Sequence, residues 1–303
     1  MTAGETAEEE GDLAALHNAI DQHLVGNYLD LPGAPLMLCV VGDPGIGKTY
    51  TIKQHLTACM IAPYEISASA MAHHMEGVAV KPLIRCYRDA SARLGVQSAA
   101  VIIDDIDRSI MANYRSIGHT VHSQLLTGFL MDLCDNPRRI VTEDAGSTRS
   151  MADVERVPVF LTANALTGLD TALTRPQRMR IFRFNPTTED RCAMIASALQ
   201  PEIGMSFALS TGDFAALELR FRTQPIAFFG DLYATLLAGA MPNMNGPRFF
   251  NREDMAVQLK ARRYEWLSRL GQTIAAYDLA VVMSAAERLE RARMMGLGGG
   301  GPA

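Results

Sequence analysis

Eight consecutive residues in the first fifth of the chain have the types and spacing needed to bind a nucleotide phosphate. They match the pattern G-x-x-x-x-G-K-T (Walker A) and are Gly42, Asp43, Pro44, Gly45, Ile46, Gly47, Lys48 and Thr49. In such a P-loop, backbone N–H groups converge on the α- and β-phosphates, the lysine reaches the β- and γ-phosphate oxygens, and the threonine hydroxyl can ligate Mg²⁺. The sequence therefore predicts binding of ATP or GTP, with Thr49 as one Mg²⁺ ligand.

A run of carboxylates could serve the other side of the same nucleotide. Asp104, Asp105 and Asp107 follow a short apolar run, as in a Walker B element. Because open α/β sheets present their ligands at the carboxyl ends of strands, we expect Asp104 to hold Mg²⁺. Asp105 is then placed to orient or deprotonate the attacking water, and Asp107 is assigned a structural role. The alternative is a set of solvated carboxylates at a strand end.

Two further sets of polar residues lie closer to the middle of the chain. Asn164 ends another apolar run and could reach the γ-phosphate or the attacking water, although an asparagine there also suits a simple turn. Arg175 and Arg178 precede the next apolar run, together with Arg180. Such a cluster is usually a solvated basic face. The functional alternative is an arginine finger that acts on the γ-phosphate of a neighbouring subunit.

The elements that must position these residues follow an alternating pattern of short apolar runs and longer helical stretches. This pattern is typical of an α/β fold, and we expect a five-stranded parallel sheet covered by helices. The predicted strands are Leu36–Val41, Tyr64–Ser67, Ala100–Asp104, Pro158–Thr162 and Ile181–Phe184. The predicted helices between them are Thr49–Met60, Lys81–Leu94 and Val121–Cys134, and Pro137–Arg156 is predicted to be a surface insertion or hairpin.

The apolar runs typical of strands stop after Phe184, and a small helical lid domain is expected beyond that point. We assign residues 1–11 to a disordered acidic tail, 12–184 to the nucleotide-binding α/β domain, 185–296 to the lid and 297–303 to a flexible glycine-rich tail. The predicted lid helices are Thr188–Leu199, Asp213–Leu219, Ile226–Leu237, Asp254–Leu270 and Thr273–Met295.

Composition narrows the class of protein. With 303 residues, 48% hydrophobic and 20% charged, the chain can bury a substantial core. Its apolar runs are far shorter than the ~20 residues that span a bilayer, and Met1–Gly11 is acidic, unlike a signal peptide, so we expect a cytoplasmic protein without a membrane partner. Five widely spaced cysteines argue against a disulfide framework and a structural zinc site. A net charge of −5 argues against a nucleic-acid partner.

Taken together, the P-loop, the carboxylate run, the Thr162–Asn164 segment, the arginines and the helical lid resemble an AAA+ P-loop NTPase. Several further segments resemble the plant and cyanobacterial type of Rubisco activase, over about Leu13 to Met295. These segments are Ala19–Leu24, Asn27–Pro32, Pro82–Ala90, His119–Gln124, Met131–Pro137, Arg178–Met179, Pro186–Arg191 and Gln224–Gly230.

This resemblance implies a role for each candidate residue. Lys48 and Thr49 would hold ATP, Asp104 and Asp105 would serve Mg²⁺ and hydrolysis, and Asn164 would be sensor 1. Arg175 and Arg178 would be the inter-subunit arginines of a ring-shaped homo-oligomer, a hexamer. Loops lining the ring pore would pull on a protein client and release inhibitory sugar phosphates from Rubisco. The candidate pore segments are His73–Val78 and Ser109–Gly118.

The sequence also departs from that family at several places, which leaves the client open. Few residues precede the match where the family has a Rubisco-engaging region, Tyr233 stands where the family has the sensor 2 arginine, and Met241–Arg248 differs from the lid region linked to client choice. The alternatives are an AAA+ remodeller of another protein and a nucleic-acid-associated motor or loader. A P-loop kinase is a third. For a photosynthetic eukaryote, the compartment would be the plastid stroma.

Overall fold

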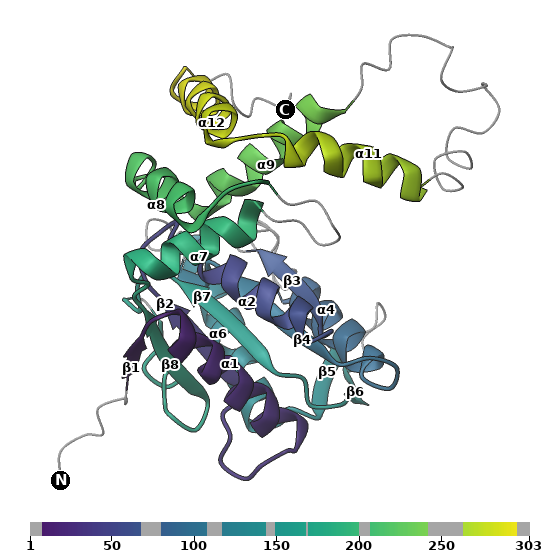
Figure 1. Ribbon diagram of the computed structural model, residues 1–303. Coiled ribbons are helices and arrows are strands. Elements are labelled where there is room, and N and C mark those ends of the chain that lie inside the picture. The colour runs from purple at the N-terminus through teal and green to yellow at the C-terminus, as the bar shows by residue number, and fades with distance from the viewer. Residues whose placement is uncertain are drawn as a thin grey trace. The chain divides into compact units, whose positions relative to one another are not determined.

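The computed structural model describes residues 8–67, 80–107, 117–143, 149–167, 169–199, 207–241 and 263–295. The chain divides into two compact units, Met1–Thr187 and Thr188–Ala303 (Figure 1). The candidate pore segment His73–Val78, most of Ser109–Gly118 and all but Met241 of the lid segment Met241–Arg248 lie outside the described residues. Within the described ranges, no helix has the length and apolar character needed to cross a membrane.

The first unit is built on a parallel sheet in the order β1-β8-β2-β7-β4-β3. Its strands are β1 (Glu8–Gly11), β2 (Met37–Val41), β3 (Ala62–Ser67), β4 (Ala99–Asp104), β7 (Val159–Ala163) and β8 (Met179–Phe184). In this order β2 lies between two strands that come much later in the chain. The carboxyl end of β2 is therefore at a crossover of the sheet, where α/β folds bind their ligands.

The sheet has six strands in its described part, so the prediction of five was wrong. The additional strand is β1, which pairs with β8 from Glu8↔Ile181 to Gly11↔Phe184. We had assigned these residues to the acidic tail because three successive glutamates carry no apolar alternation. An edge strand has a hydrogen-bonding partner on one side only and tolerates charge, so its sequence resembles that of a solvated segment.

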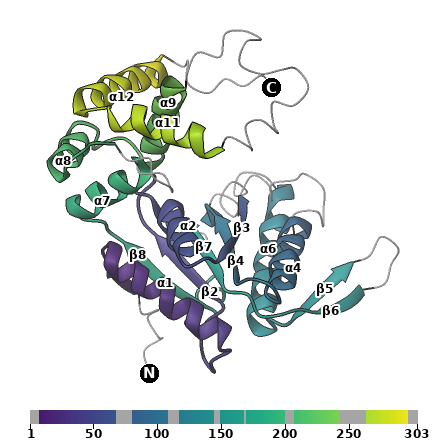
Figure 2. The ribbon, with the colours of Figure 1, turned by 45° about the vertical axis from the view of Figure 1, so that its right-hand side comes forward.

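Helices cover both faces of this sheet. The helices are α1 (Leu13–Tyr28), α2 (Lys48–Ala58), α4 (Lys81–Arg93) and α6 (Ile117–Asp135). One face packs Cys39 and Ile103 against Tyr87 of α4 and Leu130 of α6. Because side chains alternate along a strand, residues such as Phe160 face the other side, where its ring contacts His23 of α1 at 5.0 Å between centroids. Figure 2 shows α1 and α2 on one side of the strands and α4 and α6 on the other.

Between α6 and β7 the chain forms an antiparallel pair of strands, β5 (Arg139–Glu143) and β6 (Arg149–Asp153). Figure 2 shows this pair projecting from the sheet. The prediction of an insertion or hairpin at Pro137–Arg156 is therefore confirmed. Its base is fastened to α4, because the Tyr87 hydroxyl donates a hydrogen bond to Pro137 O at 2.9 Å and accepts one from Val157 N at 3.0 Å.

The regular elements described in the second unit are all helices. The helices are α7 (Thr188–Leu199), α8 (Thr211–Arg220), α9 (Ile226–Ala240), α11 (Arg263–Ala275) and α12 (Leu279–Met294). Phe221, which follows α8, and Phe228 and Phe229 of α9 form a buried aromatic cluster, in which Phe228 lies 5.5 Å from Phe221 and 5.3 Å from Phe229 between ring centroids. The helix predicted from Thr273 begins instead at Leu279, since Asp278 caps it by accepting a hydrogen bond from Val281 N. Tyr233 is half-buried beside Phe207.

Candidate nucleotide-binding and hydrolysis site

The P-loop connects the end of β2 to the start of α2, as its sequence requires. Gly45 and Gly47 have φ angles of 82° and 98°, a left-handed region that glycine enters without strain. At Gly42 an added Cβ would lie 2.6 Å from Ile46 Cδ1 and 2.7 Å from Phe184 O, so the loop has room only for glycine there. Gly47 is the N-cap of α2 and makes no side-chain cap, which leaves the first N–H groups of the helix suited to an anion.

Lys48 ties this loop to the end of β7. The side chain is 6% exposed, and Nζ donates hydrogen bonds to Gly42 O at 2.7 Å, Asp43 O at 3.0 Å and Asn164 Oδ1 at 3.0 Å. Burial lowers the pKa of Lys48, and four nearby carboxylates oppose that shift: those of Asp105, Asp107, Asp104 and Asp43. The ammonium group therefore lies in a strongly negative environment and is held by neutral acceptors that a phosphate can replace.

The Mg²⁺ ligands expected from the sequence are in direct contact with each other. Thr49 Oγ1 donates a hydrogen bond to Asp104 Oδ1, and Thr162 Oγ1 donates to the same oxygen at 2.7 Å. The two threonine hydroxyl oxygens are 3.4 Å apart. A hydroxyl oxygen beside a carboxylate oxygen is a donor set that Mg²⁺ accepts when phosphate and water complete its octahedron, so these residues fit the ion.

Asp105 and Asn164 are fixed by their backbones. Asp105 has a φ of 52°, and its N–H donates to Thr162 Oγ1 at 3.0 Å. Aspartate adopts this left-handed conformation more readily than most residues, and the conformation turns the chain immediately after β4. Asn164 N donates to Asp107 Oδ2 at 3.1 Å, and Asp107 is 7% exposed. Asp107 therefore orients Asn164, which agrees with a structural role.

Thr162 was absent from the site residues expected from the sequence. It is fully buried and connects Thr49, Asp104 and the backbone of Asp105. The only signal in the sequence was a hydroxyl residue near the end of an otherwise apolar strand. That signal is weak, because threonine is also common in strands for its β-branched shape alone.

The two arginines lie at the opposite edge of the sheet. Met179, the first residue of β8, pairs with Met37 at the start of β2, whereas the P-loop follows Val41 at its end. Five strand residues separate the two edges by about 17 Å. Neither Arg175 nor Arg178 is therefore placed to act on the nucleotide of its own chain, and any catalytic role requires a second copy.

The two arginines also differ from each other. Arg178 is held by its own chain: Nε and Nη2 donate to the Asp135 carboxylate at 2.9 and 2.6 Å, and Nη1 donates to Ala172 O at 2.9 Å. The hydrogen bond to Asp135 raises the pKa of Arg178. Arg175 is exposed. Its carbonyl accepts N–H groups from Arg178 and Met179, which fixes the backbone and leaves the side chain at the surface.

Comparisons with known proteins agree with this geometry. The family model of the ATPase family associated with various cellular activities (AAA) matches residues 38–187. The Rubisco activase of Chlamydomonas reinhardtii is 28% identical over 215 residues, covering 70% of this chain and 51% of the relative. The Rubisco activase of Cucumis sativus is 28% identical over 223 residues, covering 73% and 52%. The chain spans about half the length of the curated relatives it matches.

A solved structure, the FIGL-1 AAA domain, aligns with 91% of this chain and 86% of its own, at 16% identity and a TM-score of 0.48.

Proposed function

This chain is an AAA+ ATPase similar to Rubisco activases, and from that premise we propose that it couples ATP hydrolysis to the remodelling of a protein client, an inhibitor-blocked Rubisco. The observation that carries the ATPase part is the convergence of three strand ends on one point. Thr162 of β7 joins Thr49 of the P-loop to Asp104 of β4, and Lys48 bonds Asn164.

Each residue has one task in hydrolysis. Lys48 exchanges the Gly42 and Asp43 carbonyls for β- and γ-phosphate oxygens, which costs no large rearrangement because the ammonium group already lies in the loop. Thr49 and Asp104 would hold Mg²⁺, which would supply positive charge to the phosphate groups. Asp105 orients the attacking water and accepts its proton, and Asn164 positions that water or the γ-phosphate.

The arginine edge supports a ring-shaped homo-oligomer, and by resemblance to the family we propose a hexamer. Arg175 is exposed and is the residue we assign to the γ-phosphate of the neighbouring subunit. Arg178, held by Asp135 and Ala172, fixes the loop that carries Arg175. We therefore expect Arg175 alone, and not both arginines, to act on the neighbouring subunit.

The client proposal rests on the relatives, whose names describe Rubisco activases, and is tested separately from hydrolysis. The protein and ATP are mixed with Rubisco blocked by a sugar-phosphate inhibitor, from the same source, and carboxylation is followed. We expect recovery with ATP and none with a non-hydrolysable analogue or with Lys48→Ala. Lys53→Ala is the matched control, since Lys53 pairs with Glu65 on the surface.

A parallel measurement distinguishes the other client classes. ATPase activity is compared with Rubisco, with single-stranded DNA and with neither. Stimulation by Rubisco alone agrees with the proposal. No recovery of carboxylation, with ATPase activity unchanged by Rubisco, contradicts Rubisco as client and leaves a remodeller of another protein; stimulation by DNA alone indicates a nucleic-acid motor. If Rubisco is the client, we expect the protein in the cytoplasm, or in the plastid stroma of a photosynthetic eukaryote.

A further inference from the structure

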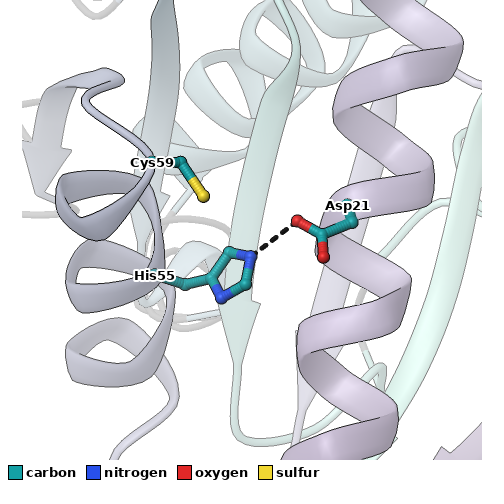
Figure 3. A group of neighbouring side chains, drawn as sticks. All are labelled: Asp21, His55 and Cys59. Carbon is teal, nitrogen blue, oxygen red and sulfur yellow. Dashed lines mark hydrogen bonds and ion pairs between the residues drawn. The ribbon is translucent and has the colours of Figure 1, made fainter.

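Three side chains of different chemistry meet on the surface between α1 and α2, away from the P-loop. Figure 3 shows Asp21 on α1 facing His55 on α2 and Cys59, the residue that follows α2. His55 Nε2 lies 2.7 Å from Asp21 Oδ1, and one ligand atom from each of the three residues lies within 4.8 Å of the others. His55 and Cys59 are four residues apart, so one helical turn places both on the face that meets Asp21.

We propose that Asp21, His55 and Cys59 form a binding site for Zn²⁺, with water as the fourth ligand. Imidazole nitrogen, thiolate sulfur and carboxylate oxygen are the three ligand types that Zn²⁺ takes from proteins, and the thiolate disfavours Mg²⁺ and Ca²⁺. Two ligands bonded at about 2.0–2.1 Å in a tetrahedron lie about 3.3 Å apart. His55 Nε2 and Asp21 Oδ1, at 2.7 Å, are closer than that value, and all three ligand atoms lie within 4.8 Å of one another, so small side-chain movements would suffice.

The surroundings allow the small movements that such a site needs. Asp21 and Cys59 are exposed, so their side chains can rotate toward a common point, and solvent water can reach an ion bound between them. The His55 ring is less free, because it stacks on His17 with centroids 4.6 Å apart and an interplanar angle of 29°. An ordinary surface pair of His55 and Asp21 would not require the Cys59 thiol beside it, whereas a Zn²⁺ site would use it as a ligand. Among the described cysteines, Cys59 is the exposed one.

This site is distinct from the nucleotide site. Lys48 begins α2 and Cys59 follows its last residue, so the two ends are separated by about 16 Å along the helix axis. The zinc ligands come from both α1 and α2, and a bound ion would join the two helices on one face of the sheet. The expected consequence is a more stable first unit, since a ligand bound only by the folded state stabilises it.

The test uses the whole chain, stripped with a chelator and freed of nucleotide and Mg²⁺. Titration calorimetry with ZnCl₂ should show one equivalent of binding, with a proton released because the Cys59 thiol must become a thiolate. Thermal unfolding should shift upward with Zn²⁺ and return with chelator. Replacing Zn²⁺ by Co²⁺ should give the thiolate-to-metal absorption band. Cys59→Ser, Asp21→Asn and His55→Gln should each weaken binding by about tenfold or more, and Cys59→Ser should remove the band.

Two matched variants make the result decisive. Cys192→Ser changes a partly buried cysteine of the second unit and should bind Zn²⁺ as the native chain does. Asp104→Asn changes the Mg²⁺ site and should also leave Zn²⁺ binding unchanged. The proposal is overturned if the native chain binds no Zn²⁺, if binding survives in all three ligand variants, or if Asp104→Asn removes it, because the ion would then occupy the nucleotide site.

Discussion

The two edges of the parallel sheet carry charge in different ways. At the carboxyl edge, the carboxylates of Asp105, Asp107, Asp104 and Asp43 surround Lys48, whose hydrogen-bond acceptors are two carbonyls and an amide. Four carboxylates near one ammonium group leave an excess of negative charge. An added Mg²⁺ would compensate that excess, and besides the ion and the nucleotide this edge would then need only the arginine that we propose a neighbouring subunit supplies.

At the amino edge, charges are matched within the chain. Arg156 donates to Asn27 Oδ1 and Asp30 Oδ1, both at 2.8 Å, and to Ala34 O at 2.6 Å, and Arg178 is paired with Asp135. Arg175 stands apart as an exposed cation on a fixed backbone. The difference agrees with the proposals that the carboxyl edge binds a nucleotide and that Arg175, at the amino edge, acts on another molecule.

The largest effect is expected from Lys48→Ala at the carboxyl edge. The change removes the cation that is bonded to the P-loop carbonyls, so tight ATP binding and hydrolysis should both be lost. Binding is measured with a fluorescent ATP analogue, with Lys53→Ala as the control. Native affinity in Lys48→Ala would contradict the assignment of this edge.

Arg175→Ala tests the amino edge. If Arg175 acts on a neighbour, the variant should keep its ATP affinity and its melting temperature and lose about 10³-fold in hydrolysis rate. Arg178→Ala should instead lower the melting temperature, because it breaks the bidentate pair with Asp135. Specific activity of the native protein should rise with concentration. A flat specific activity, or equal melting temperatures of the two variants, would remove the distinction drawn between these arginines.

Asp105→Asn should separate binding from turnover. Asparagine tolerates the φ of 52° and nearly preserves the shape, but it cannot accept the proton of the attacking water. We expect ATP affinity to be unchanged and hydrolysis to fall by about 100-fold or more. Rate and affinity are measured on the same preparation. If Asp105→Asn hydrolysed ATP at the native rate, a group other than Asp105 would have to activate the attacking water.

Thr162→Val tests whether the buried hydroxyl organises the carboxyl edge. Valine has a closely similar shape, so the strand should fold, while Asp104 loses a hydrogen bond and Asp105 N loses its acceptor. Removing such a supporting contact should weaken the apparent Mg²⁺ affinity in the ATPase assay by about 10- to 100-fold. Thr127→Val, another buried threonine, is the control. If the Mg²⁺ dependence of the ATPase activity were unchanged, the Thr162 hydroxyl would have no role in the site beyond packing.

The smallest effect is the loss of folding stability at low pH, which we expect from His23 near the amino edge. Burial lowers the pKa of His23 from 6.5 to about 3, opposed by its hydrogen bond to Val159 O and assisted by the charges of Arg180 and Arg156. The unfolded chain therefore binds a proton that the folded chain does not, and stability falls as pH drops below about 6.5, by about 2 kcal/mol at pH 5. Urea unfolding at pH 7 and pH 5 measures this loss, which should be much smaller in His23→Gln. Equal losses in both proteins would exclude His23 as the cause.

The pattern of apolar residues along the sequence predicted most of the strands of the sheet, but it did not predict which side chains of different helices lie together. The apolar runs before Gly42, Asp104 and Asn164 became β2, β4 and β7, because buried parallel strands need continuous apolar sequence. The edge strand β1 was missed, because its glutamates carry no such signal. The group of Asp21, His55 and Cys59 could not be predicted, because it depends on how α1 packs against α2. The spacing of residues along the sequence does not give that packing. Predictions for His73–Val78 stay untested.

The acidic edge strand also has a consequence for how the protein behaves in solution. A parallel sheet ending at β8 would expose the backbone of a strand whose Ile181, Phe182 and Phe184 are apolar, and such an edge readily pairs with other chains. β1 occupies that edge and presents glutamates as the new border of the sheet. A version of the chain shortened by its first eleven residues should therefore aggregate on heating or at high concentration, even with its ATPase residues intact.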